Sequence, residues 1–292
     1  MSTAQLYLMS DSTTQPNFQA WAQAISVQLD TAGWTKTADT GQVNWASNPA
    51  VPAANAWTLY EIRQPASDPL QTGATAYYIR IDYGLQNSGG CNLRVTLGTG
   101  TNGAGTLTGF VTTPAPGGNS ATGTGSVTWE CDFSWDASRM GILLWRNNYA
   151  NYHNPAFIAI ERTKAANGSD NSDGVTLVYA TGGSTNQFFW QQTIVFGIGL
   201  PPSFNSQGFL LCSPNFGNGT SLNFNNSVPL SPIFPCYGKW GNPMTVMAVA
   251  QYADTIDGAF MTTTLYGATR TYLMTKAIAM QQGQCYMFMR YD

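Results

Sequence analysis

The sequence predicts a mainly β protein: an antiparallel β-sandwich or barrel-like domain with one N-terminal amphipathic α-helix and long loops rich in Gly and Pro. Short runs of alternating apolar and polar residues recur along the chain, and clusters of Gly, Asn, Ser and Pro separate them. Only one segment has a helical period. Because strands do not alternate with helices, a parallel sheet is disfavoured.

The helix is expected over residues 16–31. Its apolar residues recur at steps of three and four, as one face of an α-helix requires: Phe18, Trp21, Ile25 and Leu29. Pro16 suits the first turn, and Gly33 is placed to end the helix. The chain therefore divides into an N-terminal segment, residues 1–35, whose helix packs on a β-rich body, residues 36–292.

Strands are expected through most of this body. In residues 77–83 the apolar positions Tyr77, Ile79, Ile81 and Tyr83 alternate with polar ones. Further candidate strands cover residues 92–97, 127–135, 141–145, 157–162, 175–180, 188–196, 209–212, 244–250, 259–266, 271–274 and 285–291.

Three stretches read as loops. Residues 98–126 are almost entirely Gly, Thr, Asn, Ala and Pro, and we expect an extended loop that orders on contact. Residues 163–174 are polar enough for a linker or a hairpin tip, and a division of the body into two subdomains would fall there. Residues 200–243 contain seven prolines, which cannot donate to a strand ladder, so irregular or edge-like structure is expected.

Composition limits the possible functions. Charged residues make up only 9% of the 292 residues and the net charge is −3, which excludes a basic nucleic-acid binder. A nearly uncharged polar surface favours association between molecules. The start of the chain lacks the pattern of a secretory signal, and no apolar run is long enough to span a membrane. Five widely spaced cysteines fit buried free thiols better than disulfides or zinc.

The best candidates for enzyme chemistry are carboxylates. Glu130 and Asp132 stand two apart on an expected strand and so share a face, with Trp129 and Trp135 nearby. A glycoside hydrolase uses two carboxylates as acid and as base or nucleophile. Glu161 is a weaker candidate for the same role. The alternative is a strand face on which an arginine pairs with these acids.

Other motifs carry weaker signals. Gly98, Gly100 and Gly103 match a dinucleotide fingerprint, but no helical pattern follows them, so a loop is expected. His153 is the only histidine and lies in a polar, aromatic loop. Residues 170–174 resemble a calcium loop but lack the required register, so a turn is expected. The sequence therefore predicts no catalytic, cofactor-binding or metal site.

Several stretches taken together resemble a known group of proteins. They are the helical residues 17–26, then 33–45 with Gly33-Trp34, 57–62 with Trp57, 98–109 and 241–244. In this order they resemble a loose group of tailed-bacteriophage virion proteins encoded among head and tail structural genes. The resemblance runs along most of the chain and carries no catalytic motif.

The resemblance and the composition lead to one functional hypothesis and two rivals. The first is a non-enzymatic structural component of a phage virion, in its tail, baseplate, collar or head, which contacts its own copies and other virion proteins. It implies no cofactor, no nucleic acid, no membrane insertion and a location in the virion. The alternative is a receptor- or glycan-binding module of the adsorption apparatus, and a glycan-degrading enzyme is the third.

Overall fold

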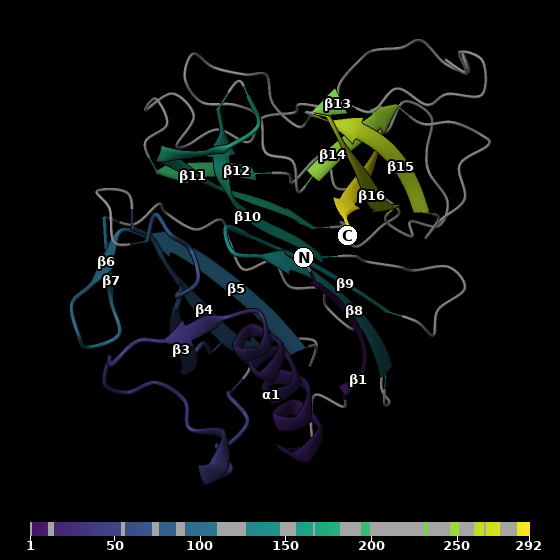
Figure 1. The fold of residues 1–292 in the computed structure, drawn as a ribbon. Helices are drawn as coiled ribbons and strands as arrows, with labels where there is room; N and C mark the ends of the chain where they lie inside the picture. The colour runs from purple at the N-terminus through teal and green to yellow at the C-terminus, as the bar shows by residue number, and fades with distance from the viewer. Residues whose placement is uncertain are drawn as a thin grey trace.

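The computed structural model describes residues 2–10, 15–53, 56–71, 76–85, 91–109, 127–146, 156–165, 167–181, 194–198, 231–232, 246–250, 260–265, 267–274 and 285–292. Its architecture is mainly β, as predicted, with antiparallel sheets and one α-helix near the start of the chain (Figure 1). The sheets in the described part of the chain stay open and close no barrel, so the sandwich alternative is the one observed.

A six-stranded sheet is the largest element. Its order is β1 (Ser2–Ser10), β8 (Val127–Asp136), β9 (Arg139–Arg146), β10 (Ala156–Lys164), β11 (Asp170–Thr181) and β12 (Ile194–Ile198). The sequence did not predict β1, which pairs antiparallel with β8 from Ser2↔Trp135 to Ser10↔Val127. This pairing joins the start of the chain to its middle.

A four-stranded sheet packs against the six-stranded one. Its order is β2 (Trp34–Lys36), β3 (Leu59–Pro65), β4 (Tyr78–Leu85) and β5 (Cys91–Gly98). A short hairpin of β6 (Gly100–Thr101) and β7 (Leu107–Thr108) follows β5, and a 3-10 turn, η1, covers Trp45–Ser47. Strands β2 and β3 were not among the predicted strands.

A five-stranded sheet ends the chain. Its order is β13 (Ser231–Pro232), β14 (Val246–Ala250), β17 (Cys285–Arg290), β16 (Ala268–Met274) and β15 (Phe260–Leu265). Strand β17 contacts β9, so this sheet lies against the six-stranded sheet on the side away from the four-stranded one (Figure 1).

Helix α1 (Gln15–Thr31) closes one side of the sandwich. It contacts β1 and β2, which are edge strands of the two facing sheets, while β5 and β12 approach each other at the opposite edges. The predicted apolar face of the helix is buried in the core between the sheets. Gly33 ends the helical segment with a φ of 78°, a conformation that glycine adopts without strain.

The main core lies between the two facing sheets and α1. Strand alternation supplies its side chains: Ile79, Ile81 and Tyr83 from β4, Phe133 from β8, Ile142 from β9 and Ile160 from β10. On the opposite face, Asp132 of β8 and Arg139 of β9 contact Tyr291 and Asp292, which follow β17 of the five-stranded sheet. Residues 130–135 of β8 and 139–143 of β9 are therefore buried on both faces.

Three loop predictions have different outcomes. Residues 163–174 include the end of β10 and the start of β11, which pair antiparallel up to Lys164↔Asp170, so the hairpin alternative is the one observed. Residues 98–109 are not an extended arm: they form β6, β7 and their turn, packed on the rest of the chain. Residues 110–126, most of 200–243, and the predicted strand 209–212 lie outside the described residues.

Within the part of the chain that is described, no helix has the length and apolarity to cross a bilayer.

Candidate functional site

The predicted carboxylate pair is buried on β8, beside the edge strand β1. Glu130 and Asp132 share one face of β8, as predicted, and Gln5 of β1 is paired with Asp132 in the strand register. The Gln5 amide nitrogen donates to Glu130 Oε1 at 2.6 Å and to Asp132 Oδ1 at 3.1 Å. The exposed fraction is 4% for Glu130 and 0% for Asp132.

Tyr291, just after β17, covers the pair from the five-stranded sheet. Its hydroxyl donates to Asp132 Oδ1 at 3.4 Å. Burial and the nearby Asp132 carboxylate raise the pKa of Tyr291, so the hydroxyl keeps its proton. A glycan could reach these carboxylates only if Tyr291 and its strand moved away.

Glu161 lies in a second buried cluster beside β17. It faces Arg139 across the β9–β10 ladder and is 1% exposed. Arg139 donates to Ser134 Oγ at 3.0 Å and to the backbone oxygen of Asp292 at 3.3 Å. Burial and the neighbouring Arg290 charge lower the pKa of Arg139, against nearby carboxylates that raise it. These contacts join the five-stranded sheet to the six-stranded sheet.

The Asp39 carboxylate accepts hydrogen bonds from the glycine-rich residues 98–109 and helps to hold them against the sheet. Asp39 accepts hydrogen bonds from Thr37 Oγ1 at 2.6 Å, Thr101 Oγ1 at 2.9 Å and the Gly105 backbone N–H at 3.1 Å. Burial alone would raise the pKa of Asp39, but these hydrogen bonds outweigh it and lower the pKa. The segment is a docked hairpin and not a strand-to-helix turn.

The remaining motifs show no site in the part of the chain that the structure describes. His153 lies outside the described residues. The turn predicted at residues 170–174 is wrong: these residues begin β11, and the turn lies just before them, at residues 167–169, where Gly168 has a φ of 83°. Among the described residues no cluster of His, Cys, Asp or Glu could hold a metal ion. Cys131 is free and buried, and burial raises its pKa.

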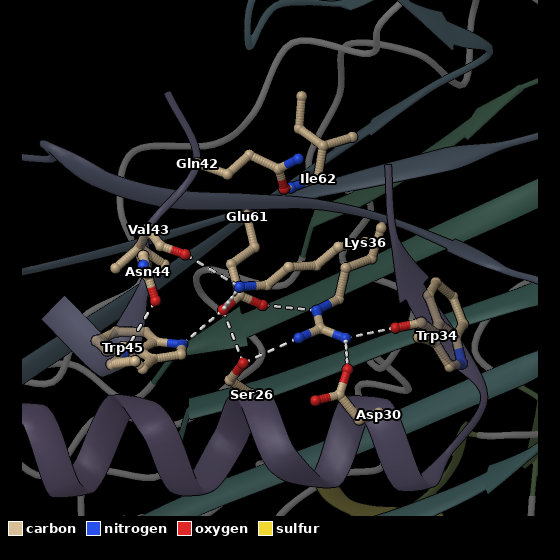
Figure 2. A network of polar contacts seen from close by, with 12 residues as sticks. Ser26, Asp30, Trp34, Lys36, Gln42, Val43, Asn44, Trp45, Glu61 and Ile62 are labelled. Atoms are coloured by element: carbon tan, nitrogen blue, oxygen red, sulfur yellow. Dashed lines mark hydrogen bonds and ion pairs between the residues drawn. The ribbon is translucent and has the colours of Figure 1, made fainter. Parts of the chain in front are cut away.

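A buried ion-pair network joins α1 to β3 (Figure 2), and no pattern in the sequence predicts it. Glu61 Oε1 accepts from Ser26 Oγ at 2.7 Å, from Trp45 Nε1 at 2.7 Å and from Lys36 Nζ at 3.1 Å. Glu61 Oε2 accepts from Arg63 Nε at 2.6 Å. Figure 2 shows Ser26 on the helix pointing toward Glu61.

Arg63 completes this network. It donates to Asp30 Oδ1, to the Trp34 backbone oxygen and to Ser26 Oγ, so all three of its nitrogens are used. Burial alone would lower the pKa of Arg63, but the Glu61 and Asp30 carboxylates raise it. Two carboxylates balance Lys36 and Arg63, which makes the network a neutral structural connection between helix and sheet.

The outer face of the four-stranded sheet has a different character. Asp82 of β4 accepts from Arg80 Nη2 at 2.7 Å and from Arg94 Nε at 3.2 Å. The Arg80 guanidinium lies 4.1 Å from the centre of the Tyr60 ring, and that of Arg94 lies 4.8 Å from the centre of the Trp57 ring. Both arginines are about one quarter exposed, at 24% and 27%.

Glycine makes room for Trp57 on this face. A Cβ at Gly84 would lie 2.8 Å from Trp57 Cε3 and 2.6 Å from the Ala56 backbone oxygen. Only a residue without a side chain allows so close an approach. Aromatic and arginine side chains are common at protein and ligand interfaces, so this face is the best candidate for an interaction surface.

Comparisons of this chain with protein-family models, with curated proteins and with solved structures found no match.

Proposed function

We propose that this chain is a non-enzymatic structural component of a phage virion that acts through contacts with its own copies and with other virion proteins. The observation that supports the proposal is that the candidate catalytic acids are buried and contact other groups of the same chain. Glu130, Asp132 and Glu161 are buried beside β1 or β17 and face groups of the same chain. A general acid or nucleophile must contact its substrate, whereas Glu130 and Asp132 accept hydrogen bonds from Gln5, and Glu161 faces Arg139.

Composition supports the same proposal. The chain has only 12 Lys and Arg residues, and several described arginines pair with carboxylates of the same chain. Such a surface gives little charge repulsion between copies, which favours assembly. The resemblance to tailed-bacteriophage virion proteins is the reason for proposing that the assembly is a phage particle.

Protein analysis of purified particles tests this function. Particles of the phage that encodes the chain are banded on a density gradient, washed in high salt and examined by quantitative mass spectrometry. We expect the chain in the particle band at a fixed ratio to the other structural proteins. Recovery only in the soluble fraction of the lysate would overturn the proposal.

A second candidate function is a receptor- or glycan-binding module. Arg94, held against Trp57 on the outer face, favours it, because an arginine binds acidic groups such as those of acidic polysaccharides. Tryptophan fluorescence titrated with host surface polysaccharide tests it. A saturable change that is lost in Trp57→Ala would favour this candidate, and an unchanged signal would reject it.

A further inference from the structure

We propose that Arg94, held in place by Trp57 and Asp82 on the outer face of β5, binds a side-chain carboxylate of a neighbouring protein subunit. The proposal rests on the assembly function above and names the chemistry of one contact. The evidence is a difference between two neighbouring arginines: all three guanidinium nitrogens of Arg80 donate hydrogen bonds within the chain, whereas only one nitrogen of Arg94 does so among the described residues.

Arg80 is fully engaged within the chain. Its Nε and Nη2 donate to Asp82 Oδ1 at 2.9 and 2.7 Å, and its Nη1 donates to the Gly105 backbone oxygen. All three nitrogens of this guanidinium therefore have acceptors, which fixes Arg80 between β4 and the docked hairpin. Arg80 has little left to offer a partner.

Arg94 uses one nitrogen only. Its Nε donates to Asp82 Oδ2 at 3.2 Å, and neither Nη1 nor Nη2 has a hydrogen-bond partner among the described residues. A guanidinium can grip a carboxylate through its Nη1–Nη2 edge with two parallel hydrogen bonds. This edge is the one that Arg94 leaves open.

The Arg94 side chain is held before any partner arrives. Its guanidinium lies against the Trp57 ring, whose position depends on the missing side chain of Gly84, and Asp82 anchors Nε from a site that is 1% exposed. Only 27% of the Arg94 side chain is exposed. Ordering a free arginine costs side-chain entropy, and a side chain held in this way loses less on binding.

Charge also favours a carboxylate. Arg80, Arg94 and Asp82 carry two positive charges and one negative, so this trio has a net charge of +1. It lies on a chain whose overall charge is −3 and whose surface has few charges. An incoming carboxylate would neutralise the trio.

A protein side chain is favoured over an acidic sugar. Sugars bind on open aromatic faces, but the Tyr60 ring carries the Arg80 guanidinium and the half-buried Trp57 ring carries that of Arg94. The group on this face that remains available for binding is the Nη1–Nη2 edge of Arg94. That edge alone is enough to bind the carboxylate of an Asp or Glu side chain.

Two immobilised polyanions serve as probes: poly-L-glutamate and polygalacturonate, each compared with uncharged dextran at low salt. Binding of the full chain is measured for wild type, Arg94→Gln and Arg94→Lys. Arg270→Gln is the matched control. Arg270 is half-buried on β16, in another sheet, so the substitution removes one positive charge away from the proposed contact. Circular dichroism confirms that each variant is folded.

We expect wild type to bind poly-L-glutamate, Arg94→Gln to bind about tenfold more weakly, and Arg270→Gln to match wild type. Arg94→Lys should fall between them, because an ammonium cannot make the paired contact. Equal losses in Arg94→Gln and Arg270→Gln, no binding of poly-L-glutamate, or tighter binding of polygalacturonate would each overturn the proposal. Recovery of the chain in particles would still support the assembly function in any of these cases.

Discussion

Charged side chains point inward at several places, and partners within the chain neutralise them. Glu61 and Arg63 lie on the core face of β3, where alternation would normally place apolar residues. Removing one partner of a buried ion pair leaves the other charge in a medium that solvates it poorly. These residues should therefore affect stability far more than surface charges do.

Arg63→Met tests the network beneath α1. It removes the Nε donor of Glu61 Oε2 and a donor to Ser26. We expect the free energy of unfolding to fall by about 3–5 kcal/mol, as for other broken buried ion pairs. Chemical denaturation followed by circular dichroism measures it.

The double variant Glu61→Gln with Arg63→Met is the control. It removes the uncompensated charge, so part of the lost stability should return. A loss below about 1 kcal/mol for Arg63→Met would mean that the pair behaves like an exposed one.

Asp39 gives a pH-dependent prediction. Its pKa is lower in the folded chain than the ordinary value, so the folded state prefers the ionised form. That stabilisation is present above about pH 4 and is lost as the pH falls through the folded pKa. In Asp39→Asn this contribution is absent, so the difference in Tm between wild type and variant should shrink below about pH 4. A difference that stays constant from pH 6 to pH 2.5 would contradict the assignment.

At the scale of elements, the docked hairpin β6–β7 is the clearest departure from a free loop. Gly103 and Gly105 both have positive φ, at 77° and 88°. A Cβ at Gly105 would lie 2.1 Å from the Tyr60 hydroxyl oxygen, whereas a Cβ at Gly103 would meet nothing within 4 Å. The two positions therefore separate backbone strain from packing.

Gly105→Ala should destabilise the protein by about 2–4 kcal/mol, through strain and a clash with Tyr60. Gly103→Ala should cost only about 1 kcal/mol, from strain alone. Thermal unfolding of both variants measures the difference. Similar small losses in the two variants would show that the hairpin is not docked.

The elements also show which parts of the fold can be read from sequence. Helix α1 and strands β4 and β8 were predictable because their apolar residues recur with a period of 3.6 in the helix and 2 in the strands. Strand β3 was not, because Glu61 and Arg63 occupy its inward positions. Their partners include Ser26 and Asp30 of α1, which lie more than 30 residues away in sequence.

The candidate sites were partly predictable for the same reason. Spacing placed Glu130 and Asp132 on one face correctly. It could not reveal that Gln5, more than 120 residues before the pair, and Tyr291, more than 150 residues after it, bind these carboxylates. The Trp57–Arg94 contact depends on Gly84, which lacks a periodic signal. A side chain's role depends on its burial and on its partners far away in sequence, and the local sequence pattern contains information on neither.

At the scale of the whole molecule, the last residues connect two sheets. Tyr291 donates to Asp132, and Asp292 accepts from Arg139 and, at 2.7 Å, from Arg290. Deleting residues 291–292 should lower the free energy of unfolding by about 2–3 kcal/mol, because buried arginines lose acceptors. Tyr291→Phe, which loses one hydroxyl, should cost about 1 kcal/mol. Equal stability of wild type and the deletion in urea would contradict this connection.

Assembly is the property on which the functional account depends. A low surface charge, internally paired acids and an open arginine edge all favour contact between subunits. Light scattering of the purified full chain across a concentration series measures the native mass directly. The account predicts a fixed oligomer, whose number would narrow the position in the virion by symmetry. A monomer at every concentration would contradict self-assembly.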